Sequence, residues 1–113
     1  MIGQGYVGLT ISMGASSVGH QVVGVDLSES VIQGLKSGKS HIEGILDQEI
    51  SKAISAGIFN PSSSYDLVEP CDVVVIAVPT PLDSSGAPNL SLLQSASESL
   101  GKVLKRPTLI INE

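Results

Sequence analysis

The sequence predicts an α/β domain with a parallel β-sheet and helices on both of its faces. Two observations support this fold class. Short runs rich in β-branched residues alternate with segments whose apolar residues recur at helical spacing. The run Val73–Val78 is apolar throughout and lacks the alternation of a half-exposed strand, which is typical of a strand covered on both faces. Strands that alternate with helices in this way favour a parallel sheet.

The first half of the chain carries signals for three helices and one strand. The Ser28 hydroxyl is placed to accept a hydrogen bond from the first turn of a helix, and Gly38 suits the end of that helix. Asp47 gives a later helix an acidic start. The expected elements are a helix over residues 5–18, a strand over 21–25, a helix between Ser28 and Gly38, a loop over 39–46 and a helix over 47–56.

The second half is expected to contain two buried strands and one long helix. Pro70 closes a single helical turn, and Asn89 can cap the helix that follows a loop rich in Pro, Ser and Gly. The expected elements are a weak edge strand over 58–60, a turn over 60–64, a helical turn over 65–69, a buried strand over 73–78, a loop over 79–89, a helix to about residue 105 and a buried strand over 108–112.

Length and composition limit the classes of function. The chain has 113 residues, which is enough for one domain and not for separate cofactor and substrate lobes. Its net charge of −5 leaves no basic stripe for a nucleic acid or an anionic membrane surface. One cysteine, Cys71, forms no internal disulfide, and no Cys or His cluster has the spacing of a metal site. We expect a cytoplasmic protein without a metal, a nucleic acid partner or a membrane span.

Three glycines near the start form a G-x-G-x-x-G pattern, with Gly3, Gly5 and Gly8 opening the first expected helix. Asp26 follows Gly8 by 18 residues and ends a strand, where dinucleotide-binding domains place an acidic side chain on the adenosine ribose. The alternative is a tight strand-to-helix turn, with Asp26 capping the next helix. The carboxylate, without a Lys or Arg just after it, favours NAD over NADP because a 2′-phosphate would be repelled.

Four segments, in this order and spacing, resemble one known family. They are Gly3-Gln4-Gly5-Tyr6-Val7-Gly8-Leu9, Gly24-Val25-Asp26, Gly38-Lys39-Ser40 and Val78-Pro79-Thr80-Pro81-Leu82. Together they resemble the N-terminal NAD-binding domain of the UDP-glucose and UDP-N-acetylmannosamine dehydrogenases, over almost the whole chain. The resemblance implies a Rossmann-type doubly wound sheet over residues 1–113. It also implies that the complete enzyme, a homo-oligomer, oxidises the C6 alcohol of a UDP-sugar to a carboxylate with two NAD.

The resemblance also implies a set of cofactor contacts. In the family, the segment like Pro79-Thr80-Pro81 lies over the cofactor, so Thr80 is expected to contact NAD; the alternative is a loop that two prolines only make rigid. The expected cofactor-binding residues are Gly3, Gly5, Tyr6, Val7, Gly8, Asp26, Val78, Pro79 and Thr80.

No catalytic residue is expected among these 113 residues. By the resemblance, the family's nucleophilic cysteine, catalytic lysine and glutamate are expected to lie beyond the end of this chain, and its central and UDP-binding domains are expected to be absent. Cys71 precedes a strand on the side of the sheet away from the cofactor, and His20 and His41 are interpreted as surface polar residues. The chain alone is therefore expected to be inactive. Two alternatives stay open: a non-catalytic NAD-binding or assembly module, and another Rossmann dehydrogenase, such as a hydroxyacid or hydroxyacyl-CoA enzyme.

The start of the chain conflicts with a complete sheet of this kind. The strand before the glycine loop is central in a doubly wound sheet, yet only Met1 and Ile2 precede Gly3. The domain is therefore expected to be truncated there, with this strand either a stub or replaced by another segment. A missing central strand leaves backbone groups unpaired and favours marginal stability or strand donation by a neighbouring chain.

Overall fold

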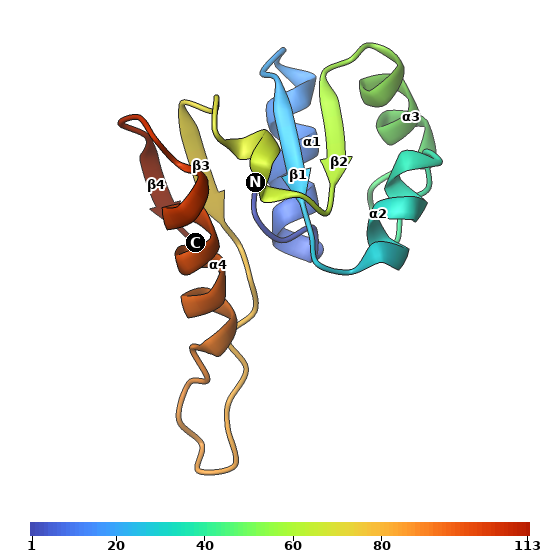
Figure 1. Ribbon diagram of the computed structural model, residues 1–113. Helices are drawn as coiled ribbons and strands as arrows, with labels where there is room; N and C mark the ends of the chain where they lie inside the picture. Colours follow the sequence, from blue (N-terminus) through green and yellow to red (C-terminus); the bar gives the residue numbers. More distant parts are fainter.

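The computed structural model describes residues 1–113 and consists of one layer of parallel strands between helices (Figure 1). The expected order of strands and helices is confirmed. The strands are β1 (Val22–Val25), β2 (Phe59–Ser62), β3 (Val73–Ile76) and β4 (Leu109–Asn112); the helices are α1 (Tyr6–Ser17), α2 (Glu29–Lys36), α3 (Asp47–Ser55) and α4 (Ser91–Val103), with the short 3-10 helix η1 (Tyr65–Val68).

The strands form two parallel pairs that the N-terminus joins. β1 pairs with β2, and β3 pairs with β4. Ile2 bridges Val25 at the end of β1 and Ile76 at the end of β3, both in parallel register. Residues 1–3 are thus the stub of the central strand, one of the two outcomes that the sequence left open. Figure 1 shows the N-terminus between β1 and β3.

Local chemistry explains where α2 begins and ends and where α3 begins. The Ser28 hydroxyl accepts a hydrogen bond from the Val31 N–H, which confirms the predicted cap. Gly38 follows that helix with a φ of +76°, a conformation in which glycine avoids the Cβ penalty. At the start of α3, the Glu49 carboxylate accepts a hydrogen bond from the Leu46 N–H at 2.8 Å.

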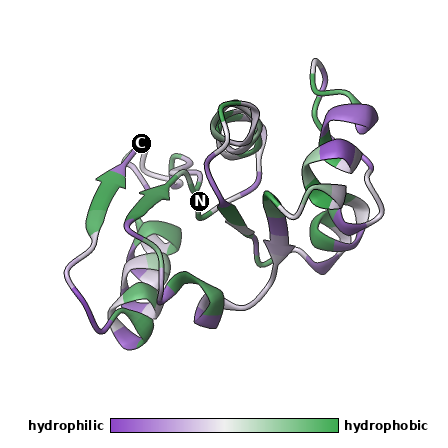
Figure 2. Cartoon of the chain, turned by 90° about the horizontal axis from the view of Figure 1, so that it is seen from above, coloured by the Kyte–Doolittle hydropathy of each residue, from purple (hydrophilic) through white to green (hydrophobic).

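Two apolar clusters hold the helices on opposite faces of the sheet. One contains Ile2, Val25, Val68, Val74, Ile76, Ala96 and Leu100 and joins η1 and α4 to the strands. The other contains Leu9, Leu35, Ile50 and Phe59 and joins α1, α2 and α3 to β2. Figure 2 shows α1 on one side of the strands and η1 with α4 on the other, so the expected helical cover of both faces is confirmed. No helix combines the length and the apolar character needed to cross a membrane.

The expected turn over residues 60–64 is wrong in its first part, because Asn60, Pro61 and Ser62 continue β2. Proline lacks an N–H and is tolerated in an edge strand when that N–H would face away from the neighbour. β2 is such an edge, and Pro61 lies opposite Gly24 of β1. The strand is therefore longer than proline suggested.

The expectation of buried strands is only partly correct. In β3, Val74 and Ile76 are buried under α4 and η1, whereas Val73 points to the other face of the sheet and is 48% exposed. All four residues of β4 are exposed, since this strand pairs only with β3 and ends the sheet. The apolar sequence of β4 predicted the strand correctly and its burial wrongly.

Candidate functional site: the carboxyl edge of the sheet

The glycine loop lies at the carboxyl edge of the sheet, where the stub ends and α1 begins. Gly3 has a φ of +88°, and a Cβ placed on it would lie 2.7 Å from the Ala77 carbonyl oxygen after β3. A Cβ on Gly8 would overlap the carbonyl oxygen of Gly3. These two positions therefore require glycine, one for its backbone conformation and both for close packing.

The first turn of α1 leaves backbone donors free beside an open space. Gly5 is the N-cap, without a side chain to accept hydrogen bonds, and a Cβ on it would meet nothing within 4 Å. The first helical hydrogen bond in this turn runs from the Leu9 N–H to the Gly5 carbonyl. The N–H groups of Tyr6, Val7 and Gly8 have no helical acceptor, and Tyr6 is 69% exposed. This geometry suits an anionic group at the helix N-terminus.

Asp26 stands directly after β1 and faces the glycine loop. Its Oδ2 accepts a hydrogen bond from the Gln4 N–H at 2.7 Å, and its Oδ1 accepts one from the Ser28 N–H at 2.8 Å. The half-buried carboxylate thus touches the glycine loop and the start of α2 together, and it keeps further acceptor capacity. Burial, and then the negative charge of Asp26, raise the pKa of the Tyr65 phenol in η1 above its ordinary value.

The segment after β3 completes this edge. Val78 is half-buried against the first apolar cluster, and its N–H lies 3.4 Å from a Cβ placed on Gly3. Pro79 and Thr80 follow it into an exposed loop, where the Thr80 hydroxyl makes no hydrogen bond to the rest of the chain. The structure therefore brings Gly3 and Val78 together, with Thr80 two residues farther along.

Two residues at this edge were missed by sequence reasoning. The Gln4 side chain is fully buried, and its amide lies between the Gly3 carbonyl at 3.0 Å and the Ser12 hydroxyl at 3.2 Å. The His41 Nε2 lies 2.8 Å from the Gln4 carbonyl oxygen and ties the loop after α2 to the glycine loop. The prediction that His41 is a surface residue is confirmed by its exposure, but its contact with Gln4 also makes it part of this site. No known motif predicts the contact between Gln4 and Ser12 or the one between Gln4 and His41, because neither follows the spacing of a helix or a strand.

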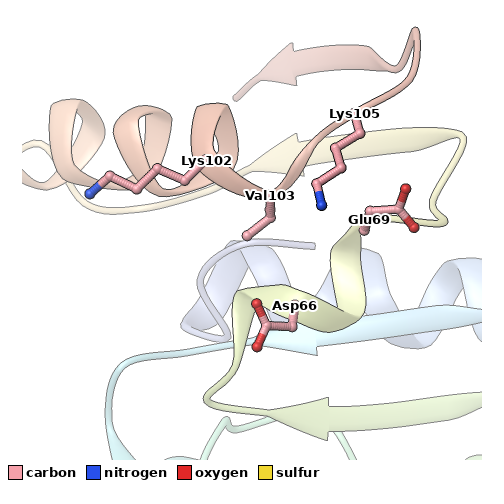
Figure 3. A pocket seen from close by; sticks show the side chains of 5 residues that line it. All are labelled: Asp66, Glu69, Lys102, Val103 and Lys105. Carbon is pink, nitrogen blue, oxygen red and sulfur yellow. The ribbon is translucent and has the colours of Figure 1, made fainter.

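Other groups that could carry chemistry lie away from this edge. Cys71, placed by the sequence on the side away from the cofactor, precedes β3 and borders a cavity with His20. A second hollow, of about 370 Å³, is lined by Asp66, Glu69, Lys102, Val103 and Lys105, with the basic side chains coming from the end of α4 and its neighbouring residues (Figure 3). Its charges are mixed and it lies between η1 and α4, on the opposite face from α1. No three His, Cys, Asp or Glu side chains in the chain are placed to share a metal ion.

A parallel sheet with a G-x-G-x-x-G loop, an open helix N-terminus and an acidic residue after the next strand defines a Rossmann-type dinucleotide-binding domain. The comparison with known families agrees with this class. Residues 1–113 match the NAD-binding domain of the UDP-glucose/GDP-mannose dehydrogenase family, so the chain belongs to that family.

Relatives that match this chain include nucleotide-sugar dehydrogenases. NDP-N-acetyl-D-galactosaminuronic acid dehydrogenase of Ralstonia nicotianae is 33% identical over 114 residues, covering 100% of this chain and 26% of that protein. UDP-N-acetyl-D-mannosamine dehydrogenase of Campylobacter jejuni is 35% identical over 115 residues, covering 100% and 28%. The solved UDP-D-ManNAc dehydrogenase of Pyrococcus horikoshii superposes with a TM-score of 0.92 at 33% identity, covering 99% and 27%. The chain thus spans about a quarter of the length of these relatives.

Proposed function

We propose that residues at the carboxyl edge of the sheet hold NAD, and that this domain serves a dehydrogenase acting on a nucleotide sugar. The observation that carries the proposal is the free N-terminus of α1 beside Gly5, with the Asp26 carboxylate joined to the same loop. The two features supply donors for a diphosphate and an acceptor for ribose hydroxyls. The edge thus offers both kinds of group that a dinucleotide needs.

Each predicted cofactor residue receives a proposed role from its position. Gly3 and Gly8 shape the loop, and Gly5 leaves room for the diphosphate. The N–H groups of the first turn donate to the phosphate oxygens, and Asp26 accepts from the ribose. Val78 and Pro79 extend the edge from β3 toward the exposed Thr80 hydroxyl, which donates to the cofactor. The residues given roles in the first turn are Tyr6, Val7 and Gly8.

The cofactor is NAD rather than NADP. A 2′-phosphate on the ribose would meet the negative charge of Asp26. The nearest basic residue after it in the sequence, Lys36, ends α2, and Lys39 is paired with Asp47 at 2.9 Å. Neither ion pair of the chain involves Asp26, so no paired cation offsets that repulsion.

The reaction that fits the family is oxidation of the C6 alcohol of a UDP-sugar to a carboxylate. NAD, when bound, supplies the hydride acceptor for two successive oxidations. This chain's own residues bind and orient that cofactor. Asp26, His41 and Thr80 at the carboxyl edge are given cofactor-binding or structural roles, so we propose that groups outside the 113 residues hold the sugar and carry the proton transfers. The working enzyme is a homo-oligomer in this proposal.

Calorimetry with the purified chain tests the proposal. NAD is expected to bind with one site, and NADP at least about tenfold more weakly because of charge repulsion at Asp26. Gly5→Ala is expected to reduce NAD affinity by a similar factor, since its Cβ would enter the open space, while the helix loses about 1 kcal/mol or less. Equal affinities for the two dinucleotides, or no binding of NAD to the folded chain, would contradict the proposed site. Turnover of a UDP-sugar by the chain alone would contradict the proposal that groups outside these 113 residues hold the sugar and carry the proton transfers.

A further inference from the structure

His41 lies beside the glycine loop, although it belongs to the loop between α2 and α3. Its Nε2 is 2.8 Å from the Gln4 carbonyl oxygen. A carbonyl oxygen only accepts hydrogen bonds, so Nε2 carries a proton and donates it. The other ring nitrogen, Nδ1, makes no hydrogen bond to the rest of the chain, and His41 is exposed. A second proton can therefore be added at Nδ1 without loss of the contact with Gln4.

The Gln4 carbonyl belongs to the peptide group that also contains the Gly5 N–H. The chain has no cis peptide bond, so the C=O and the N–H of this planar group point in opposite directions. Because the carbonyl faces His41, the Gly5 N–H is directed away from the imidazole. That N–H makes no hydrogen bond to the rest of the chain, and Gly5 is exposed. His41 thus fixes the direction of a free donor at the start of α1.

The peptide group between Gln4 and Gly5 needs such a contact to keep its orientation. On one side, Asp26 accepts from the Gln4 N–H at 2.7 Å, and the Gln4 side chain is fully buried. On the other side, Gly5 has no Cβ, and nothing lies within 4 Å of the place that a Cβ would occupy. Glycine permits backbone rotations that other residues resist. The hydrogen bond from His41 is the one that the Gln4 carbonyl accepts, so this bond opposes the rotation.

The groups near His41 differ in how they respond to pH. The titratable groups on its own loop and on the elements next to it are Asp26 after β1, Tyr6 of α1, Lys39, Glu43 and Asp47 of α3. Hydrogen bonds from a backbone N–H and from Lys39 lower the pKa of the Asp47 carboxyl, and Asp47 in turn raises the pKa of Lys39. Carboxylates, lysines and phenols ordinarily keep their charge state between about pH 6 and pH 8, whereas an imidazole ordinarily changes its own there. His41 is therefore the group of this set that changes charge near neutral pH.

We propose that His41 is a positioning residue for the cofactor: its hydrogen bond to the Gln4 carbonyl holds the Gly5 N–H for the diphosphate, and its protonation strengthens diphosphate binding. This inference rests on the proposed function of the carboxyl edge. A charge-assisted hydrogen bond is stronger than a neutral one, and the imidazolium adds a positive charge beside the start of α1. Since protonation favours the anion, the anion favours protonation, and NAD affinity rises as the pH falls through the imidazole titration.

Calorimetry with NAD at pH 8 and at pH 6 tests the inference. The original chain is expected to bind NAD about three- to tenfold more tightly at pH 6. His41→Gln keeps a neutral N–H donor, so its affinity at pH 8 should stay within about twofold of the original and should not increase at pH 6. His41→Ala removes the donor, so it should bind about three- to tenfold more weakly than the original chain at pH 8, again without an increase at pH 6.

His20→Gln is the matched control for the loss of an imidazole. His20 is also exposed, but it precedes β1 and lies at the opposite end of the sheet. The NAD affinity of this variant, and its dependence on pH, should equal those of the original chain.

A second measurement follows the peptide group without NAD. The chemical shift of the Gly5 amide nitrogen should change with pH as the His41 imidazole titrates, because the two groups share the Gln4 carbonyl. In His41→Gln the Gly5 amide should lose this response, whereas in His20→Gln it should keep it.

Equal pH dependence of NAD affinity in the original chain and in His41→Gln would overturn the inference, as would a Gly5 amide that does not respond to the His41 titration. If His41→Ala does not fold, His41→Gln still decides the question, because it retains the donor. Absence of NAD binding to the folded original chain would instead contradict the proposed function, and the Gly5 amide would still show whether His41 holds this peptide group.

Discussion

The Asp26 carboxylate accepts a hydrogen bond from the Gln4 N–H at 2.7 Å, which joins the end of β1 to the loop between the stub and α1. The other carboxylate oxygen accepts from the Ser28 N–H at 2.8 Å. Asp26 therefore has a structural role without any cofactor, and loss of its side chain would leave two backbone donors unpaired. Effects on stability and on cofactor binding must be separated when this residue is tested.

Asp26→Ala is expected to lower both the free energy of unfolding and the affinity for NAD, by different mechanisms. Removal of an acceptor from two half-buried N–H groups costs about 1 to 3 kcal/mol of unfolding free energy. Loss of the ribose contact and of the negative charge is expected to weaken NAD binding about tenfold or more and to reduce the discrimination against NADP. Denaturant unfolding measures the first effect, and calorimetry with both dinucleotides measures the second.

Asp66→Ala is the matched control for this prediction. Asp66 is an exposed acidic residue of η1, so its loss changes the net charge equally and removes no contact with the glycine loop. We expect its NAD and NADP affinities to equal those of the original chain. If Asp26→Ala kept the original preference for NAD, the assignment of Asp26 to the ribose would be wrong.

Alanine substitutions at two glycines of α1 are expected to change the stability of the fold in opposite directions. A Cβ on Gly8 would overlap the Gly3 carbonyl oxygen, so Gly8→Ala must displace the glycine loop, and we expect a loss of about 1 to 3 kcal/mol. A Cβ on Gly14 would meet nothing within 4 Å, so Gly14→Ala should gain up to about 1 kcal/mol from helix propensity. Chemical denaturation of both variants checks this. A stable Gly8→Ala chain with unchanged NAD affinity would contradict the role given to close helix packing.

The sequence was sufficient to predict the glycine loop because the spacing of Gly3, Gly5 and Gly8 is local, although the close packing of Gly3 is against Ala77, far away in the sequence. The turn, the free helix N-terminus and the carboxylate after β1 are separated by short, fixed stretches of chain, so spacing alone predicted which residues lie at one edge. The cap at Ser28 and the order of strands were predictable for the same reason. Such features depend on neighbours in sequence.

The features that the sequence did not predict depend on contacts between segments that are far apart in the sequence. The apolar run Val73–Val78 indicated cover on both faces, but only the face of Val74 and Ile76 packs against helices, and Val73 is exposed on the other. Leu109, Ile110 and Ile111 are exposed because β4 has no neighbour on its outer side. The contact of His41 with the Gln4 carbonyl joins segments 37 residues apart, and no periodicity encodes it.

The Thr80 hydroxyl offers a test of cofactor binding that is free of stability effects. Thr80 is exposed in the loop after β3, and its side chain contacts no hydrogen-bond partner in the chain, so Thr80→Val should change the unfolding free energy by less than about 0.5 kcal/mol. Loss of one hydrogen bond to NAD is expected to weaken binding about two- to tenfold. The control for NAD binding is Thr108→Val, at the opposite end of the sheet; it loses hydrogen bonds to the Cys71 and Arg106 carbonyls and some stability, but should bind NAD as the original chain does. Unchanged affinity in Thr80→Val would show that the loop positions the edge without a hydroxyl contact.

The buried N-terminus is expected to make stability depend on pH. Burial lowers the pKa of the Met1 ammonium below its ordinary value of 8.0, an effect that the Cys71 charge partly opposes. Between the lowered pKa and 8.0, the unfolded chain binds more protons than the folded chain, so stability rises as pH increases through this interval and levels off above it. Melting temperatures measured between pH 6 and pH 9 should show this rise. Acetylation of Met1 removes the ionisable amine and leaves its N–H able to donate to the Val23 carbonyl, so the acetylated chain should lose this part of the pH dependence. His20, His41 and Cys71 are the same in both chains, and an identical pH profile would therefore show that the ammonium is not desolvated.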